Sequence, residues 1–216
     1  IKDIQRNWIG KSVGCSVKFA VDLDNPESVR ETRSDSERVN SETRSDSEQM
    51  DSKTRSGSGQ LDSKTQSDNE KHTIEVFTTR PDTIFGVGFM VLAPEHPLVD
   101  KITTDEFRAG VEAYKTAASL KSERDRQSDV KNITGQFTGA YAIHPFTNEK
   151  IPVWIGDYVL ASYGTGAVMA VPCGDQRDYD FAKHFNIDIK NIFENVDISE
   201  AAYAEKSGKI ANSDFL

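Results

Sequence analysis

The residues around Pro81 carry the first group of side chains that could do chemistry. Thr78, Thr79 and Arg80 precede this proline, and Thr83 follows it. Proline lacks the N–H that a strand ladder needs, and it favours an extended conformation for the residue before it. Three hydroxyls and a guanidinium are therefore predicted to crowd at the end of a strand, where they could hold a polar, charged substrate. The alternative is an ordinary Pro-Asp turn with threonine caps.

A glycine-rich segment, Tyr163-Gly164-Thr165-Gly166, forms the second group, and an apolar run follows it at 167–171. The run has the length of a strand, so the segment does not open a helix as the glycine motif of dinucleotide-binding folds does. Glycine allows a ligand to approach the backbone closely. The segment is either a loop that contacts a ligand or simply a hairpin turn.

Two carboxylates, Asp175 and Asp178, form the third group. Their spacing places both in the first turn of a predicted helix, where the helix dipole favours negative charge. The neighbouring Arg177 and the helix N-terminus favour the ionised form of Asp178. An ionised Asp178 could bind a cation such as a substrate ammonium; the alternative is that both carboxylates only cap the helix.

Short strands separated by Gly, Pro and Asn dominate the elements that must position these groups. Residues 16–21 and 72–77 alternate polar and apolar side chains, as half-buried strands do, and we expect them to form a hairpin. Many short strands with few helices indicate a mainly β domain with peripheral helices, either a β-barrel or a mixed α+β fold. Further strands are predicted at 86–93, 135–143, 153–160 and 167–171.

Two helices are predicted beside these strands. Thr103 and Glu106 have the spacing of a capping box at the start of the first helix. Asp175 is the predicted N-cap of the second helix, in which Phe181 and Phe185 lie one turn apart. The apolar face of the first helix is predicted to consist of Phe107, Val111, Tyr114 and Ala118.

Residues 28–70 form a low-complexity insertion in the predicted hairpin. An 11-residue period repeats Thr-Arg-Ser-Asp-Ser-Glu from Thr32 and again from Thr43, with degraded copies from Thr54 and Thr65. One apolar residue per repeat cannot offset an ordering cost of about 1–2 kcal/mol per residue. We therefore expect a solvated, largely disordered insertion; the alternative is a functional repeat such as a stacked array of β-turns.

Composition narrows the class of protein. The formal charge of −9 repels bare phosphate backbones, and no apolar run approaches the ~18 residues of a membrane-spanning helix. The two cysteines, Cys15 and Cys173, are far apart, which fits a reducing cytoplasm, and the four histidines show no metal-ligand spacing. We expect a cytoplasmic domain that uses no metal or cofactor, and the start at Ile1 indicates a piece of a longer chain.

The three chemical segments, in this order and spacing, resemble the editing domain of leucyl-tRNA synthetases, an insertion that hydrolyses mischarged tRNA. The residues at 5–12 and 211–213 resemble the segments that enter and leave that domain. The resemblance covers about residues 1–24 and 72–216, and it leaves the repeat outside. It implies one domain over 1–216, interrupted at about 28–70, with the closed β-barrel of the valyl, isoleucyl and leucyl editing domains.

The resemblance also implies a mechanism. The substrate would be an aminoacyl ester on the terminal adenosine of tRNA, and Asp178 would pair with its α-ammonium. Thr78, Thr79 and Arg80 would orient the ester and stabilise charge on its carbonyl oxygen. Water would be the nucleophile, so the catalytic residues would be Thr79, Arg80 and Asp178, acting more by positioning than by acid–base chemistry.

Selection against leucine is assigned by the same resemblance. Thr83 would clash with the γ-branch of leucine, so that the site spares correctly charged tRNA. Met169 and Val171 would complete the side-chain pocket, Tyr163 would lie near the terminal nucleoside, and Asp175 would also contact the substrate. The implied substrates are tRNA(Leu) carrying isoleucine, methionine or norvaline.

The implied partners are the mischarged 3′ end of tRNA(Leu) and the rest of the synthetase in the same chain, with a monomer as the expected state. ATP and Mg²⁺ would serve only the full-length enzyme, because we find no nucleotide-binding or adenylate-forming motif here. One rival is a module that binds the tRNA acceptor end without hydrolysis. Another is a repeat-bearing interaction domain, which deletion of residues 28–70 would inactivate while leaving an editing hydrolase active.

Overall fold

The computed structural model describes residues 13–22, 72–128, 132–205 and 208–210. They belong to one compact unit. The predicted insertion at 28–70 lies outside the described residues, as do the segments at 5–12 and 211–213 that contribute to the resemblance.

The predicted hairpin is confirmed. Strands β1 (Cys15–Asp22) and β2 (Thr73–Thr78) pair antiparallel, with Phe19 opposite Ile74. Side chains alternate between the two faces of a strand, and accordingly Phe19, Ile74 and Val76 are buried while their chain neighbours in β2 are exposed. Thr78 continues the inward-facing series of β2, at the point where the strand ends.

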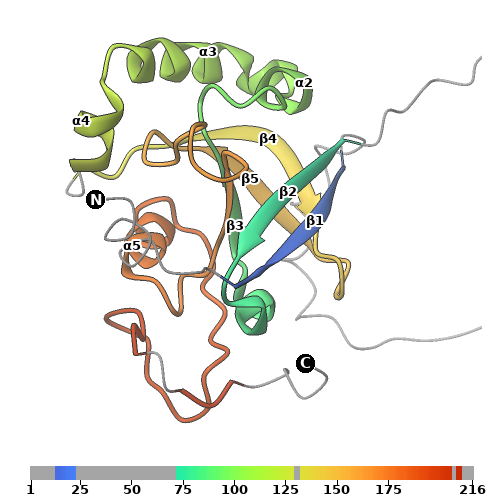
Figure 1. Cartoon of the computed structure of the whole chain (residues 1–216), viewed down its shortest axis with the longest axis vertical. Coiled ribbons are helices and arrows are strands. Elements are labelled where there is room, and N and C mark those ends of the chain that lie inside the picture. Colours follow the sequence, from blue (N-terminus) through green and yellow to red (C-terminus); the bar gives the residue numbers. More distant parts are fainter. Residues whose placement is uncertain (1–12, 23–71, 129–131, 206–207, 211–216) are drawn as a thin grey trace, which may run out of the picture. The chain divides into compact units, whose positions relative to one another are not determined.

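Six strands form a nearly closed barrel, which confirms the predicted mainly β class (Figure 1). The strand order is β2-β1-β4-β5-β3-β6, and every pair is antiparallel except β3 with β5. The edge strands β2 and β6 contact each other without a hydrogen-bonded ladder. The remaining bounds are β3 Phe89–Leu92, β4 Gln136–Ile143, β5 Lys150–Ile155 and β6 Ala167–Ala170.

The predicted strand at 153–160 is wrong in its bounds. β5 begins earlier, at Lys150, and ends at Ile155 because the chain turns at Gly156, whose carbonyl accepts a hydrogen bond from Val159 N at 3.2 Å. The predicted strand at 86–93 is also shortened, since Gly86 closes a 3₁₀-helix, η2 (Pro81–Gly86). Both differences place irregular backbone next to the cleft described below.

Side chains of β3 enter two separate cores, which explains why all four of its residues are buried. Met90 and Leu92 point into the barrel, whereas Phe89 and Val91 pack against helix α5 (Gln176–His184) on the outside. Phe89 stacks on Phe181 of that helix with ring centroids 4.8 Å apart. The outer core therefore fixes the helix that carries Asp178 against the barrel wall.

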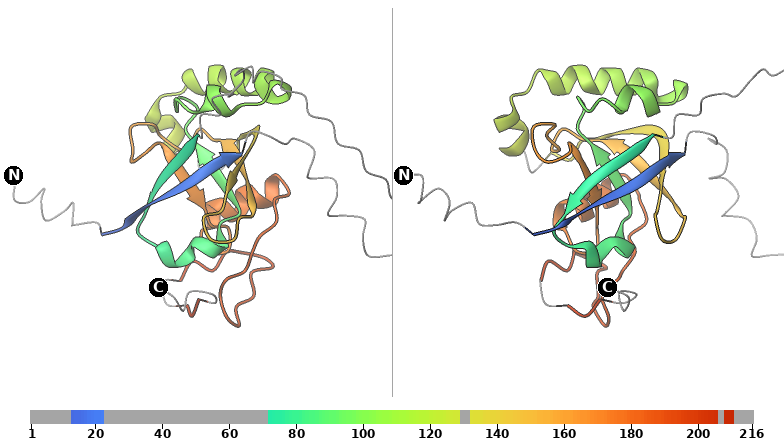
Figure 2. Two further views of the ribbon diagram at one scale, coloured as in Figure 1. Left: turned by 90° about the vertical axis from the view of Figure 1, so that its right-hand side faces the viewer. Right: turned by 45° about the vertical axis from the view of Figure 1, so that its right-hand side comes forward.

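Helices α2 (Val99–Ile102), α3 (Asp105–Ser119) and α4 (Glu123–Ser128) lie together over one end of the barrel (Figures 1 and 2). Val111 and Ala118 are buried and Phe107 and Tyr114 are half-buried, which confirms the predicted apolar face. α3 packs on β4, where Gly139 sits at a bulge with φ of +81°. A Cβ there would lie 2.0 Å from Thr104 Oγ1, so the close approach requires glycine.

The predicted capping box of α3 is wrong. Thr103 Oγ1 donates to Val99 O at 2.6 Å, and Thr104, the residue at the N-cap, makes no side-chain capping bond. Helix α3 begins one residue later than the capping box requires, and the Thr103 hydroxyl is directed towards the carbonyl of Val99 in helix α2, which was not predicted. By contrast, Asp175 caps α5 as predicted. None of the helices within the described ranges is long and apolar enough to span a membrane.

Candidate functional site

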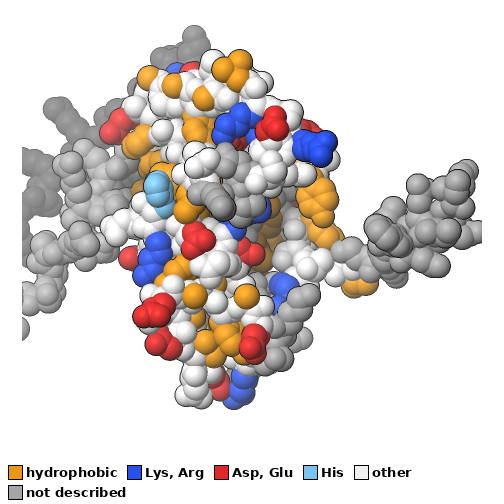
Figure 3. Space-filling view, turned by 90° about the vertical axis from the view of Figure 1, so that its left-hand side faces the viewer, with side chains coloured by type: hydrophobic (Ala, Val, Ile, Leu, Met, Phe, Trp, Pro, Cys, Tyr) orange, Lys and Arg blue, Asp and Glu red, His pale blue; other side chains and the backbone are white. Residues whose placement is uncertain are grey.

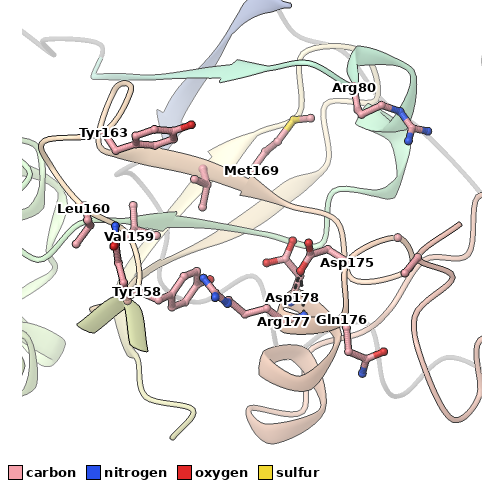
Figure 4. A pocket seen from close by; sticks show the side chains of 14 residues that line it. Arg80, Tyr158, Val159, Leu160, Tyr163, Met169, Asp175, Gln176, Arg177 and Asp178 are labelled. Atoms are coloured by element: carbon pink, nitrogen blue, oxygen red, sulfur yellow. Dashed lines mark hydrogen bonds between the residues drawn. The ribbon is translucent and has the colours of Figure 1, made fainter. Parts of the chain in front are cut away.

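A cleft with two compartments lies between η2, β6 and the start of α5. The inner compartment has a volume of about 240 Å³ and the outer one about 870 Å³. Figure 4 shows the outer compartment, with Tyr163 and Leu160 at one end, Arg80 and Asp175 at the other, and Met169 between them. The two compartments share Arg80, Met169, Gly174, Asp175, Asp178 and Ala204.

Eight of the nine residues predicted for the site line this cleft. Thr78, Thr83 and Val171 line the inner compartment, Tyr163 lines the outer one, and Arg80, Met169, Asp175 and Asp178 line both. Thr79 is exposed and lines neither compartment. Successive side chains near a strand end point to opposite faces, so the structure brings Thr78 to the cleft and turns Thr79 away.

The turn that carries Thr83 is a 3₁₀-helix with Pro81 in its first turn, a position where the missing N–H costs no hydrogen bond. Thr83 Oγ1 donates to Arg80 O at 2.9 Å, which fixes the side-chain rotamer. Thr78 Oγ1 accepts a hydrogen bond from Arg80 N at 3.0 Å. The Thr78 hydroxyl therefore still has its proton to donate to a group in the inner compartment.

The guanidinium of Arg80 forms a bidentate pair with Asp82. Arg80 Nε lies 3.0 Å from Asp82 Oδ1, and Nη2 lies 2.8 Å from Oδ2. These hydrogen bonds hold the pKa of Asp82 below its usual range. In Figure 4 the guanidinium points away from Asp178, so Arg80 borders both compartments with its charge directed to one side.

Both carboxylates of the third predicted group accept backbone hydrogen bonds at the start of α5. Asp175 Oδ1 accepts from Arg177 N at 2.9 Å and from Asp178 N at 3.1 Å. Asp178 Oδ2 accepts from Val171 N at 2.8 Å, which ties α5 to the end of β6. Asp175 is therefore the main N-cap of α5. The other oxygen of Asp178, Oδ1, has no protein hydrogen bond among those that the structure gives.

Burial raises the pKa of Asp178 to about 7. The nearby Asp175 charge adds to the rise, while the Val171 N–H and the Arg177 charge oppose it. Arg177 therefore favours ionisation as expected from the sequence, but the loss of solvent outweighs it. The guanidinium of Arg177 lies over the ring of Tyr158, 5.5 Å from its centroid, instead of pairing with Asp178 (Figure 4). Asp178 is thus a carboxylate whose burial favours its neutral form.

Several residues of the cleft wall were not predicted from the sequence, because most of them belong to no motif and are apolar or aromatic. Tyr158 is one example: its hydroxyl is buried and has no hydrogen-bond partner among the described residues. Phe193 and Tyr203, whose rings lie 5.0 Å apart, close the inner compartment from a segment that follows α5. The other residues missed are Gln127, Val159, Leu160, Gln176 and Glu205, together with Gly174 and Ala204, while Val168 and Arg177 were assigned no cleft position.

A buried arginine holds the floor of the outer compartment in place. Arg126 is 5% exposed, and it donates from Nε to Asp157 O at 2.6 Å and from Nη2 to Val159 O at 2.9 Å. Its guanidinium also pairs with Glu95, and Lys121 Nζ lies 2.7 Å from Asp157 Oδ2. Helix α4 is thereby fixed to the segment after β5 that lines the cleft.

Charged side chains of both signs are interspersed over the face of the molecule in Figure 3, without a single basic patch among the side chains described there. Tyr163 is 84% exposed at the mouth of the outer compartment. Within the described ranges, no three His, Cys, Asp or Glu side chains form a group that could hold a metal ion.

Comparisons with known proteins agree with one another. The family model described as "Leucyl-tRNA synthetase, editing domain" matches residues 55–216. The leucine–tRNA ligase of Christiangramia forsetii is 53% identical over 217 residues, which covers 100% of this chain and 18% of the relative. That of Flavobacterium psychrophilum is 55% identical over 222 residues and is covered to 20%. The chain thus spans about a fifth of the length of these curated relatives.

A solved structure is also similar. The crystal structure of the ternary complex of Agrobacterium radiobacter K84 agnB2 LeuRS, tRNA and LeuAMS matches with a TM-score of 0.58 and 28% identity, covering 94% of this chain and 19% of that one. The alignments with the two ligases run over the whole chain. They therefore include residues 28–70, which the resemblance seen in the sequence leaves outside.

Proposed function

Because the chain belongs to the family of leucyl-tRNA synthetase editing domains, we propose that it hydrolyses the ester bond between tRNA(Leu) and a wrong amino acid. The observation that carries the proposal is the two-compartment cleft with Asp178 at the junction. An aminoacyl-adenosine has the matching shape, a small side chain on one side of the α-ammonium and a nucleoside on the other. The outer volume of about 870 Å³ is within the range of ligand pockets of that size.

Asp178 binds the α-ammonium of the substrate in this proposal. At ~4 Å and an effective dielectric constant of about 20, the pair gains about 4 kcal/mol of gross Coulomb attraction before desolvation. The ammonium favours the ionised carboxylate, so substrate binding lowers the pKa of Asp178 from about 7. The partly neutral carboxylate of the free site therefore becomes charged when its ligand is present.

Positioned water attacks the ester carbonyl in the proposed reaction. The hydroxyl of Thr78 keeps a proton that it can donate to the carbonyl oxygen in the inner compartment. Arg80, whose guanidinium is paired with Asp82, orients the ester from the border of the two compartments. Thr79 was predicted from the sequence to be catalytic, but it lines neither compartment, so it makes no contact with the ester in the proposed reaction. We propose that this step needs no metal or cofactor, and that ATP and Mg²⁺ serve only aminoacylation by a full-length ligase.

The pocket for the amino acid side chain is formed by Thr83, Met169 and Val171. Thr83 excludes leucine sterically. One methylene group changes affinity by only ~1–3 kcal/mol, so a second site that destroys errors is needed for accurate decoding. The hydroxyl of Thr83 is held by Arg80 O, so the position of its methyl group decides which side chains fit. Isoleucine, methionine and norvaline are the proposed wrong amino acids.

The proposed partner is the 3′ end of tRNA(Leu). The rest of the synthetase, in the same polypeptide chain, would bring this end to the cleft, and the reaction would take place in the cytoplasm. The similar LeuRS structure is a complex with tRNA, which supports this assignment. Tyr163 at the cleft mouth offers an aromatic face for the terminal nucleoside, and Asp175 at the other end of the outer compartment also contacts the substrate in this proposal. With a formal charge of −9, the chain needs other domains for most phosphate contacts, and we propose that it is monomeric.

Deacylation of Ile-tRNA(Leu) beside Leu-tRNA(Leu), at high concentration of the 216-residue chain, tests the proposal. Rapid loss of the isoleucyl ester with the leucyl ester spared is the expected result. If neither ester is cleaved, the same assay is made with a full-length leucine–tRNA ligase carrying this segment. Cleavage there means that the chain lacks only its docking partners, whereas silence in both forms rejects hydrolysis and favours a module that only binds the acceptor end.

A further inference from the structure

His144 directly follows β4 and is buried, with 2% of its surface exposed. It does not line either compartment of the cleft. Its Nδ1 accepts hydrogen bonds from Phe146 N at 3.2 Å and Thr147 N at 3.1 Å. A neutral imidazole whose Nδ1 accepts must carry its proton on Nε2. Nε2 therefore donates to the carbonyl oxygen of Ile84, 3.1 Å away and 60 positions earlier in the chain.

Ile84 directly follows Thr83 in the turn that lines the inner compartment. The turn is held together by short bonds of its own: Thr83 N and Oγ1 both donate to Arg80 O, and Val87 N donates to Ile84 O at 3.1 Å. These bonds fix the shape of the turn but do not set its depth in the barrel. The His144 bond joins the turn to the connection between β4 and β5, which is an independent part of the barrel.

Packing supports the same connection. The ring of Phe85, the next residue of the turn, stacks on the His144 imidazole with centroids 5.6 Å apart. The far end of the turn is fixed by close packing, since a Cβ on Gly86 would lie 3.0 Å from Cys173 Sγ and 3.1 Å from Val171 Cγ1. The hydrogen bond from His144 thus anchors the middle of the turn to the connection between β4 and β5, in addition to the packing of Phe85 and Gly86.

We propose that His144 is a positioning residue that sets how far Thr83 projects into the inner compartment, and that it thereby controls the exclusion of leucine. This inference rests on the proposed editing function. Discrimination there depends on whether one methyl-sized group blocks the leucine γ-branch, and displacements of about 1 Å change such contacts strongly. Isoleucine, which the pocket admits in any case, is insensitive to the same displacement.

Two substitutions of His144 distinguish the role of its Nδ1 atom from the role of its Nε2 atom. In His144→Asn, the amide oxygen replaces Nδ1 as the acceptor at the turn after β4, but no donor reaches Ile84 O. In His144→Gln, the longer side chain places its amide nitrogen near the position of Nε2 and restores that donor. Both variants are assayed for hydrolysis of Leu-tRNA(Leu) and Ile-tRNA(Leu), in the form of the protein that cleaves the isoleucyl ester and at a temperature well below the thermal midpoints.

We expect His144→Asn to cleave Leu-tRNA(Leu) roughly three- to tenfold faster than the parent, the effect of losing one hydrogen bond. Cleavage of Ile-tRNA(Leu) changes less than about twofold, and His144→Gln spares leucine again. A general loss of structure would slow both esters together. If His144→Asn hydrolyses Leu-tRNA(Leu) no faster than the parent, or accelerates hydrolysis of both esters equally, His144 does not control specificity.

A double variant tests whether the effect passes through Thr83. In a Thr83→Ala background the blocking group is already absent, so adding His144→Asn has no further effect on Leu-tRNA(Leu) cleavage. Independent sites would instead give multiplied effects. Multiplied effects would show that His144 acts elsewhere, which contradicts the inference.

Amide hydrogen exchange separates failure of this inference from failure of the proposed function, because it needs no substrate. The N–H groups of Thr83 and Val87, both bonded within the turn, exchange faster in His144→Asn and recover in His144→Gln, while Val91 in β3 is unchanged. If exchange at Thr83 and Val87 does not change, the inference is wrong whatever the esters do. If exchange changes but the parent protein cleaves no ester, His144 holds the turn and only the editing function fails.

Discussion

Replacing Asp178 by asparagine is expected to stabilise the folded chain at pH 8 while abolishing hydrolysis. Burial raises the pKa of Asp178 from 3.8 to about 7, so keeping this side chain ionised at pH 8 opposes folding. Asparagine keeps an oxygen that can accept the hydrogen bond from Val171 N and removes the charge. It also removes the partner of the substrate ammonium, on which the proposed reaction depends.

The expected gain in the free energy of unfolding follows from the rise in the pKa of Asp178. A rise of about three pH units corresponds to about 4 kcal/mol at 1.36 kcal/mol per unit. The Asp178 side chain keeps some contact with solvent, so we expect a gain of about 2–4 kcal/mol in the free energy of unfolding at pH 8. For a chain of this size that is about 5–15 °C in thermal midpoint.

The dependence on pH gives the prediction its sign. The folded state binds the Asp178 proton more tightly than the unfolded state, so this residue makes the parent less stable as the pH rises from about 4 to about 7. Below pH 4 both states are protonated at this position, and the advantage of the asparagine variant disappears. Above pH 7 the advantage is complete.

Thermal unfolding by circular dichroism at pH 8, 6 and 4 measures the difference, alongside deacylation of Ile-tRNA(Leu). Asp180→Asn is the matched control, because Asp180 is exposed on the same helix and bonds only to Gln176 among the contacts given for it; its effect stays within about 0.5 kcal/mol. An Asp178→Asn variant that is less stable than the parent at pH 8, or equally shifted at every pH, refutes the reasoning from burial. Full hydrolytic activity in that variant refutes the ammonium-binding role.

Three further predictions concern other parts of the site. Thr83→Ala is expected to raise hydrolysis of Leu-tRNA(Leu) by roughly 10- to 100-fold while the equally bulky Thr83→Val spares it; equal behaviour of the two variants in the deacylation assay contradicts steric exclusion. Activity should rise with pH as Asp178 ionises, and Asp175→Asn, which keeps the helix cap, should move this rise in the kcat/KM profile below pH 7 because a neighbouring negative charge is gone. A profile that does not move would show that Asp175 leaves Asp178 unaffected. Arg126→Met should lower the free energy of unfolding by about 2–4 kcal/mol in urea titrations, since it leaves the carbonyls of Asp157 and Val159 without their donor, while the half-exposed Glu95 is solvated by water. The exposed Arg124→Met should change it by less than about 0.5 kcal/mol. Similar losses in both variants would argue against the buried network.

Features that depend on neighbours along the chain could be predicted from the sequence. Alternation in 16–21 and 72–77 predicts the paired strands because inward-facing side chains recur every second residue. Asp175 is recognisable as an N-cap because the N–H groups it accepts lie two and three positions away. The order of the three chemical segments is likewise a property of the chain, and the resemblance drawn from it agrees with the family match.

Alternation could also have indicated the opposite directions of Thr78 and Thr79. Ile74 and Val76 face the barrel interior, and Thr78 continues that series by two. Thr79 then falls on the other face. Knowing that polar residues gather at the end of a strand does not tell which of them face the cleft. The side of the strand on which each residue lies must be considered as well.

Properties that arise between distant segments of the chain depend on its tertiary structure and could not be predicted. The capping box at Thr103 is absent because α3 begins after Thr104 and the Thr103 hydroxyl donates to helix α2 instead. The inner compartment is closed by Phe193 and Tyr203, which carry no motif. The bond from His144 to Ile84 joins residues 60 positions apart. The pKa of Asp178 depends on how completely solvent is excluded around it, and Arg177, its neighbour in sequence, turns instead to Tyr158. Solvent exclusion and long-range contact are properties of the assembled core, so no local pattern of residues could specify them.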